Sequence, residues 1–264
     1  MKHLTCIFLF AIATFVPLGP VPAGGDKKPT PWKPFIPAET YNEITLRSLQ
    51  TIEKAAVSDD KTAAQRIEIE AVFLAGCTLS TNPGGGDYRA AARYAADLAR
   101  SGKFKGLANF SKDFFRIQRD GDVNDVTRIT KNTELIMKTM YTKAKGGEGI
   151  HPDLQYLPKL KNLNGIEALI GALANKNLSD ENLARVSKEL PLLAYRVAVF
   201  GALTHEFTPK KDVEKWRDYS LTMRDASIAL AEASSKKDAE GILKTALAIE
   251  SSCIDCHSVF KNNK

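Results

Sequence analysis

The sequence has few of the residues that define specialised protein classes. Among 264 residues there are only four cysteines, and Cys6 lies in an N-terminal apolar segment. The other three, Cys77, Cys253 and Cys256, are too few for a disulfide-rich scaffold. No dense lysine and arginine cluster with interleaved aromatics occurs, so the net charge of +6 does not indicate nucleic-acid binding. No set of acid, base and nucleophile residues suggests an enzyme.

Long apolar runs are absent except at the N-terminus. Residues 1–23 consist of MKH, the apolar run LTCIFLFAIATFVPLG and the small-residue exit PVPA. This layout predicts a signal peptide cleaved after Ala23, and therefore an exported, periplasmic or extracytoplasmic protein. No later stretch approaches the roughly 18 apolar residues that a membrane helix needs, so we expect no membrane span.

The rest of the chain has the pattern of a folded, all-helical protein. Hydrophobic residues make up 44% and charged residues 26%, and no segment alternates as a strand would. Residues 24–38 are rich in Gly, Pro and Lys and are predicted to form an extended leader. Helices are predicted at about 40–56, 59–79, 86–100, 122–143, 162–176, 181–206, 212–234 and 237–261.

A weak internal repeat divides these helices into two similar halves. Ala71-Val72-Phe73 recurs as Ala198-Val199-Phe200. Four amphipathic helices per half favour a four-helix bundle, because each apolar stripe needs a partner to pack against. We therefore predict an all-α fold of two tandem four-helix bundle-like domains. The first domain spans residues 39–145, a linker 146–160, and the second domain 161–264.

Local signals refine the predicted helix ends. Ser58 and Ser179 each precede an acidic first turn, as N-cap residues do. Pro191 lies inside an apolar helical stripe, so it should kink that helix or open it as a first-turn residue. The stripe itself consists of Val186, Leu190, Leu193, Val197 and Phe200.

The most specific signal is C-x-x-C-H near the C-terminus, formed by Cys253, Cys256 and His257. It continues an apolar stripe of the last helix, and its positions i, i+3 and i+4 share one side of that helix. Covalent attachment of haem c uses this arrangement, with two thioethers and an adjacent axial histidine. The alternatives are a zinc site, which lacks an evident fourth ligand, a redox disulfide, and coincidence.

Residues 253 to 261, CIDCHSVFK, resemble the attachment motif of class II c-type cytochromes, the cytochrome c-prime group. The resemblance covers roughly residues 160 to 264. It implies one covalent haem on Cys253 and Cys256, with His257 as the axial iron ligand. It also places Lys261 near the haem as a basic residue.

The chain departs from this family in its first bundle helix. Low-spin members have a methionine there as the sixth iron ligand, but residues 164–176 contain none. The resemblance then implies five-coordinate iron with an apolar distal side. Met223 and His205 are the alternative ligands in the domain, although Met223 fits a core position and His205 a helix C-terminus. The predicted distal residues are Ile166, Leu169 and Ile170.

The first half lacks a haem motif, because the repeat places Met137, Met140 and Tyr141 at the motif positions. It is read as a haem-less copy in which Met140 packs in the core. Cys77 is expected to be a buried hydrophobe, and His151 an exposed linker residue.

Three functions follow as hypotheses. The first is a cytochrome that carries one electron between redox partner proteins, and is not an enzyme. The second is a gas-binding haem protein that senses or scavenges NO or CO at an open iron. The third is a helical interaction protein without haem. Under the first two hypotheses, the resemblance also implies that the two bundles pair within the chain or that two chains pair as a homodimer.

Overall fold

The structure is a computed structural model that describes residues 34–77, 89–114, 133–155, 165–207 and 209–260. Within these ranges the regular elements are all helices and no strand occurs, which confirms the all-α prediction. The predicted signal peptide, most of the leader and Lys261 lie outside the described residues. The part of the chain from Trp32 onward forms one compact unit, and its division into two domains stays a prediction.

In the described residues of the first half there are three long helices and several short ones. No described helix of either half is both long enough and apolar enough to cross a membrane. The elements of the first half are α1 (Ala38–Ala56), α2 (Ala63–Cys77), α3 (Arg89–Arg100), η2 (Phe104–Leu107), α4 (Phe110–Phe114), α6 (Thr133–Thr139) and η3 (Lys143–Lys145).

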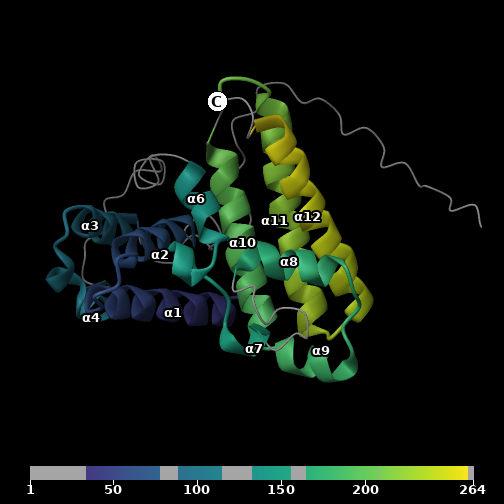
Figure 1. The fold of residues 1–264 in the computed structure, drawn as a ribbon, viewed down its shortest axis with the longest axis horizontal. Helices are drawn as coiled ribbons and strands as arrows, with labels where there is room; N and C mark the ends of the chain where they lie inside the picture. Colours follow the sequence, from purple (N-terminus) through teal and green to yellow (C-terminus); the bar gives the residue numbers. More distant parts are fainter. Residues whose placement is uncertain (1–33, 78–88, 115–132, 156–164, 208, 261–264) are drawn as a thin grey trace, which may run out of the picture. The chain divides into compact units, whose positions relative to one another are not determined.

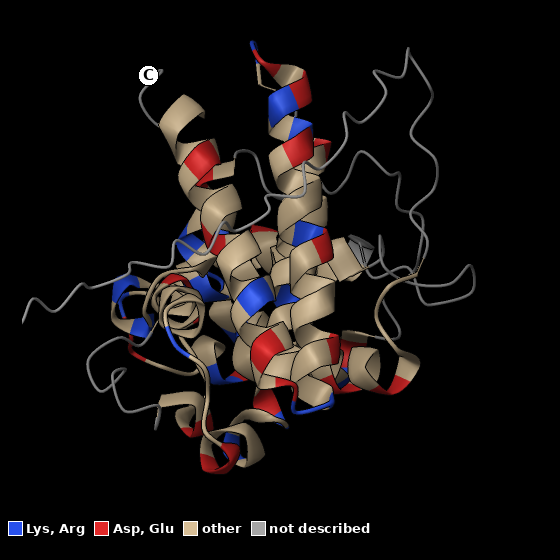
Figure 2. Ribbon diagram, turned by 90° about the vertical axis from the view of Figure 1, so that its right-hand side faces the viewer, with Lys and Arg blue, Asp and Glu red and all other residues tan. Residues whose placement is uncertain are grey.

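In the second half, α10, α11 and α12 run alongside one another, and α8 packs across α12 (Figure 1). The predicted helix at 181–206 is divided into α9 and α10. Blue segments of basic residues and red segments of acidic residues alternate along the ribbon in Figure 2. The elements are α7 (Pro152–Gln155), α8 (Ile166–Ala174), α9 (Asp180–Val186), α10 (Glu189–Glu206), α11 (Val213–Ser235) and α12 (Ala239–Phe260).

The helix-end predictions have different outcomes. Ser179 is the N-cap of α9, and its hydroxyl accepts a hydrogen bond from the Asn182 amide at 3.4 Å, as predicted. Pro191 lies in the first turn of α10, where its missing N–H costs no helical hydrogen bond. The prediction for Ser58 is wrong. Its hydroxyl instead donates to the Ala55 carbonyl at the end of α1, and α2 begins only at Ala63.

Helices α2 and α10 pack against each other at the residues that the internal repeat aligns. The rings of Phe73 and Phe200 lie 5.8 Å apart between centroids, and both side chains are fully buried. Gly76 allows this close approach, because a Cβ atom there would overlap the side chains of Leu203 and Val199. The apolar core is continuous across both halves of the chain.

Replacing Gly201 with alanine is expected to lower the free energy of unfolding by about 1–3 kcal/mol. A Cβ atom at this position would lie 2.8 Å from the Arg224 backbone nitrogen, so α10 and α11 would have to separate. Chemical denaturation measures the loss. Gly171→Ala in α8 is the matched control, because its new Cβ would meet only the flexible carboxylate of Glu250, at 3.2 Å. Equal stability of the two variants would contradict the prediction.

Candidate functional site

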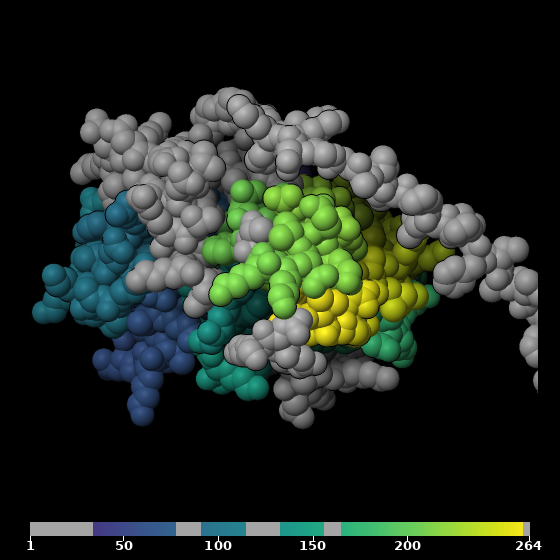
Figure 3. Space-filling view, turned by 90° about the horizontal axis from the view of Figure 1, so that it is seen from above, coloured from purple at the N-terminus to yellow at the C-terminus, as the bar shows by residue number. Residues whose placement is uncertain are grey.

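The C-x-x-C-H residues lie in the last turns of α12, where the burial of that helix decreases. Ile242, Ala246 and Ile249 are buried, and the stripe then continues through Cys253 and His257, which are half-buried. The C-terminal end of α12 lies beside the end of α10 and the start of α11 (Figure 1). Seen from above, this end of α12 reaches the surface next to them (Figure 3).

The two motif cysteines are free thiols with strongly raised pKa values. Cys253 and Cys256 form no disulfide and are both half-buried. Burial raises the pKa of each thiol to about 11, and the neighbouring Cys253 adds to the effect at Cys256. A redox C-x-x-C needs the opposite, a thiol whose pKa is lowered. The thiol chemistry therefore does not favour the redox-disulfide alternative.

Aromatic contacts fix the helix end that carries the motif. The rings of Trp216 and Phe260 meet edge to face, with centroids 5.0 Å apart. The indole Nε1 of Trp216 donates to the Thr204 carbonyl of α10 at 2.8 Å. This chain of contacts ties α12 to α11 and α10 within one turn of His257, so the motif has a defined position on the bundle.

The structure places the two alternative iron ligands differently. Met223 is only 6% exposed and belongs to the core, as predicted. Because α11 and α12 are antiparallel, Met223 lies two turns into α11 from Trp216, level with Cys253, which lies two turns before Phe260. His205 is half-buried in the last turn of α10, with Nδ1 3.5 Å from the Glu206 carboxylate.

The predicted distal residues lie on α8, which packs on α12. Ile166 and Leu169 are fully buried and Ile170 is 5% exposed, so all three belong to the apolar core. Met140 of the first half is half-buried against that core, as predicted, and its carbonyl accepts from the Glu167 amide at 3.3 Å.

The donor set of the motif fits covalent haem. Two free thiols and an imidazole lie on one side of a helix end, at the spacing that two thioethers and an axial bond require. All three side chains are half-buried, which leaves part of each accessible for attachment. Lys261, assigned to the haem surroundings by the resemblance, lies outside the described residues.

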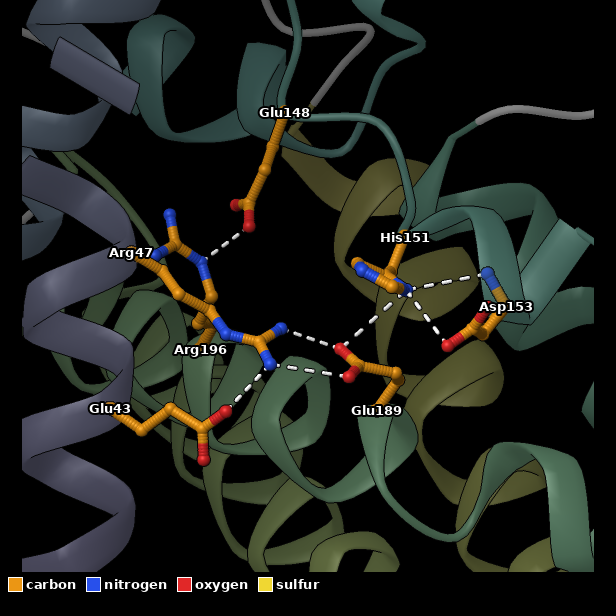
Figure 4. A network of polar contacts seen from close by, with 7 residues as sticks. All are labelled: Glu43, Arg47, Glu148, His151, Asp153, Glu189 and Arg196. Atoms are coloured by element: carbon orange, nitrogen blue, oxygen red, sulfur yellow. Dashed lines mark hydrogen bonds and ion pairs between the residues drawn. The ribbon is translucent and has the colours of Figure 1, made fainter. Parts of the chain in front are cut away.

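A second polar centre joins the two halves and has no counterpart in the sequence predictions. The Arg196 guanidinium is buried over the Phe73 ring, at 3.8 Å from its centroid. It donates to Glu70 at 2.8 Å and to the Ser48 hydroxyl at 2.7 Å. It also pairs with the carboxylate of Glu148 (Figure 4). One guanidinium thus forms ion pairs with two carboxylates that are far apart in the sequence, those of Glu70 and Glu148.

We expect the free energy of unfolding to fall as the pH rises, because of the carboxyl group of Glu148. Burial raises its pKa to about 7, despite the opposing charge of Arg196. A carboxyl whose pKa is higher in the folded than in the unfolded state contributes its stabilisation at low pH. The free energy of unfolding therefore falls by about 1–3 kcal/mol between about pH 4.5 and 7. Urea titrations across that range measure the slope.

Glu148→Gln is the variant that tests the origin of this pH dependence. Its amide cannot ionise, so the fall in unfolding free energy between pH 4.5 and 7 should become shallower. An unchanged slope would assign the effect to another group. Exposed Glu181→Gln serves as the matched control, since Glu181 forms only a surface ion pair with Arg185.

No protein-family model, curated protein or solved structure matches this chain.

Proposed function

We propose that this chain is an exported c-type cytochrome of the cytochrome c-prime type that transfers one electron between redox partner proteins. Cys253 and Cys256 would hold a single haem c through thioethers, and His257 would be its axial iron ligand. The observation that supports this most is the placement of two free thiols and an imidazole on one half-buried side of α12.

The haem supplies the one-electron redox change of its iron when it is bound. The chain's own residues would set the conditions for that change. The half-buried side of α12 provides a partly apolar surrounding, and burial is one of the factors that set a haem potential. The Trp216–Phe260 contact and the bond from Trp216 to Thr204 hold His257 and both cysteines in place.

The test is a mass and a spectrum of the mature protein, exported from a host that attaches haem to C-x-x-C-H sequences. The intact, denatured chain should carry the mass of one haem, because thioether bonds survive denaturation. Mature protein that lacks this mass would exclude the proposal and would leave the interaction protein without haem.

A gas-binding haem protein is the second candidate. It is favoured by the lack of methionine in residues 164–176 and by the core position of Met223. Dithionite-reduced spectra before and after CO separate the two functions. A high-spin spectrum that shifts with CO supports gas binding, whereas a low-spin spectrum that ignores CO supports a plain electron carrier with a sixth protein ligand.

A further inference from the structure

Three metal-ligating side chains meet outside the C-x-x-C-H motif, at the base of α10. His151 directly precedes α7, Asp153 is the second residue of α7, and Glu189 is the first residue of α10. One ligand atom of each lies within 4.8 Å of the others (Figure 4). The cluster therefore joins the linker that contains α7 to the start of α10.

The two separations from the His151 nitrogen suit a metal ion better than hydrogen bonds. The His151 Nδ1 atom lies 3.5 Å from Asp153 Oδ2 and 3.7 Å from Glu189 Oε2. Both distances are long for hydrogen bonds. A tetrahedral ion with bonds of about 2.0–2.2 Å separates its ligands by about 3.3–3.6 Å.

The Nδ1 atom of His151 is the ring nitrogen nearest to both carboxylates. The Asp153 backbone N–H donates to Nδ1 at 3.3 Å, so Nδ1 is an acceptor. A neutral imidazole with its proton on the other nitrogen is the form that binds a metal. A metal ion would take the Nδ1 lone pair in place of the Asp153 N–H, together with one oxygen of each carboxylate.

Glu189 is held in place as metal-ligating carboxylates commonly are. It is only 3% exposed, and Arg47 donates to both of its oxygens, at 2.5 and 3.2 Å. Glu43 in turn accepts from Arg47 at 2.6 Å. Such outer contacts orient ligands and tune affinity. Within these contacts, the carboxylates of Glu43 and Glu189 face the single guanidinium of Arg47, and Lys188 adds a further positive charge near Glu189.

The site has room beside it. His151 and Glu189 both line an open cavity of about 470 Å³, whose other lining residues come mainly from α1, α2, α10 and the segment 143–154. Three protein ligands leave a fourth position of a tetrahedral ion for water or a small ligand. This is the arrangement of an open zinc site, whereas a closed structural site has four protein ligands.

We propose that His151, Asp153 and Glu189 form a binding site for a divalent transition-metal ion of the zinc type, separate from the C-x-x-C-H motif. One nitrogen and two carboxylate oxygens suit zinc, whereas calcium takes six to eight ligands, all of them oxygens. The proposal is independent of haem attachment.

Isothermal titration of the mature chain with ZnCl₂ at pH 7.5 tests it. Haem thioethers, or alkylation if haem is absent, block Cys253 and Cys256, so that their thiols do not bind the probe. One zinc ion per chain is expected, with no heat from MgCl₂. His151→Ala and Asp153→Asn should each weaken zinc binding at least ten-fold.

Asp218→Asn is the matched control, because Asp218 is exposed on α11 and away from the cluster. It should bind zinc as the parent chain does. Zinc should also raise the melting temperature of the parent and of Asp218→Asn, but not of His151→Ala. Equal zinc affinity in all variants, or no binding by the folded parent chain, would overturn the proposal. The second result would leave His151 as a polar neighbour of the two carboxylates without a metal.

Discussion

Replacing Cys253 and Cys256 together with serine is expected to abolish all haem that survives denaturation. Serine hydroxyls cannot form thioethers, and the two thiols are the only free cysteines of the described second half. Haem staining after denaturing electrophoresis, with intact mass as the second measurement, should fall from one haem per chain to none. The single variants should each retain a smaller, partly attached fraction.

Cys77→Ala is the matched control for cysteine removal. Cys77 is fully buried between the halves, and burial raises the pKa of its thiol far above the usual range. We expect this variant to keep its haem with only a modest loss of stability. Denaturation-resistant haem in the double serine variant would mean that the motif is not the attachment site. Circular dichroism of both proteins separates loss of haem from loss of fold.

Arg196→Met is expected to lower the free energy of unfolding by about 3–5 kcal/mol. The substitution leaves the carboxylates of Glu70 and Glu148 without their shared counter-charge inside the protein. Removing one partner of a buried ion pair costs more free energy than the intact pair contributes, because the remaining charge stays desolvated without a counter-charge. Urea denaturation at pH 7.5, where Glu148 is largely ionised in the parent chain, measures the effect.

Two further variants make the result interpretable. Adding Glu70→Gln and Glu148→Gln to Arg196→Met removes the unpaired charges and should recover part of the loss. Arg185→Met removes an exposed ion pair with Glu181 instead, which should cost at most about 0.5 kcal/mol. If Arg196→Met were as mild as Arg185→Met, the buried network would not stabilise the fold.

Helix positions could be predicted from the sequence wherever apolar residues recur at helical spacing. The expected helices at 40–56, 212–234 and 237–261 correspond to α1, α11 and α12 with ends shifted by one or two residues. The range 181–206 was predicted as one helix because the apolar stripe continues across it, and Pro191 was the signal for the break between α9 and α10. The Ser58 prediction was wrong, since an acidic turn after a serine also occurs in the loop that leads to α2.

The motif was visible because its ligands are adjacent in sequence, whereas the other polar centres were not. Arg196, Glu70 and Glu148 are far apart along the chain, and buried ion pairs leave no local pattern. His151 was expected to be exposed, which its side chain is, but its position beside Glu189 depends on how α10 begins. The sequence His-x-Asp was the one available signal, and it is weak without the third ligand.

The contact of α2 with α10 has a consequence for how this chain could diverge. In a dimer of identical chains, every substitution occurs in both chains. An arginine introduced near the symmetry axis would therefore face a second copy of itself. Here the repeat aligns Arg196 with Ile69 and Glu70 with Val197, so the ion pair of one side corresponds to two buried aliphatic residues on the other. Joining both halves in one polypeptide permits the Arg196–Glu70 pair on one side of the contact between α2 and α10 without a copy of it on the other side. It also allows each half to acquire its own chemistry independently.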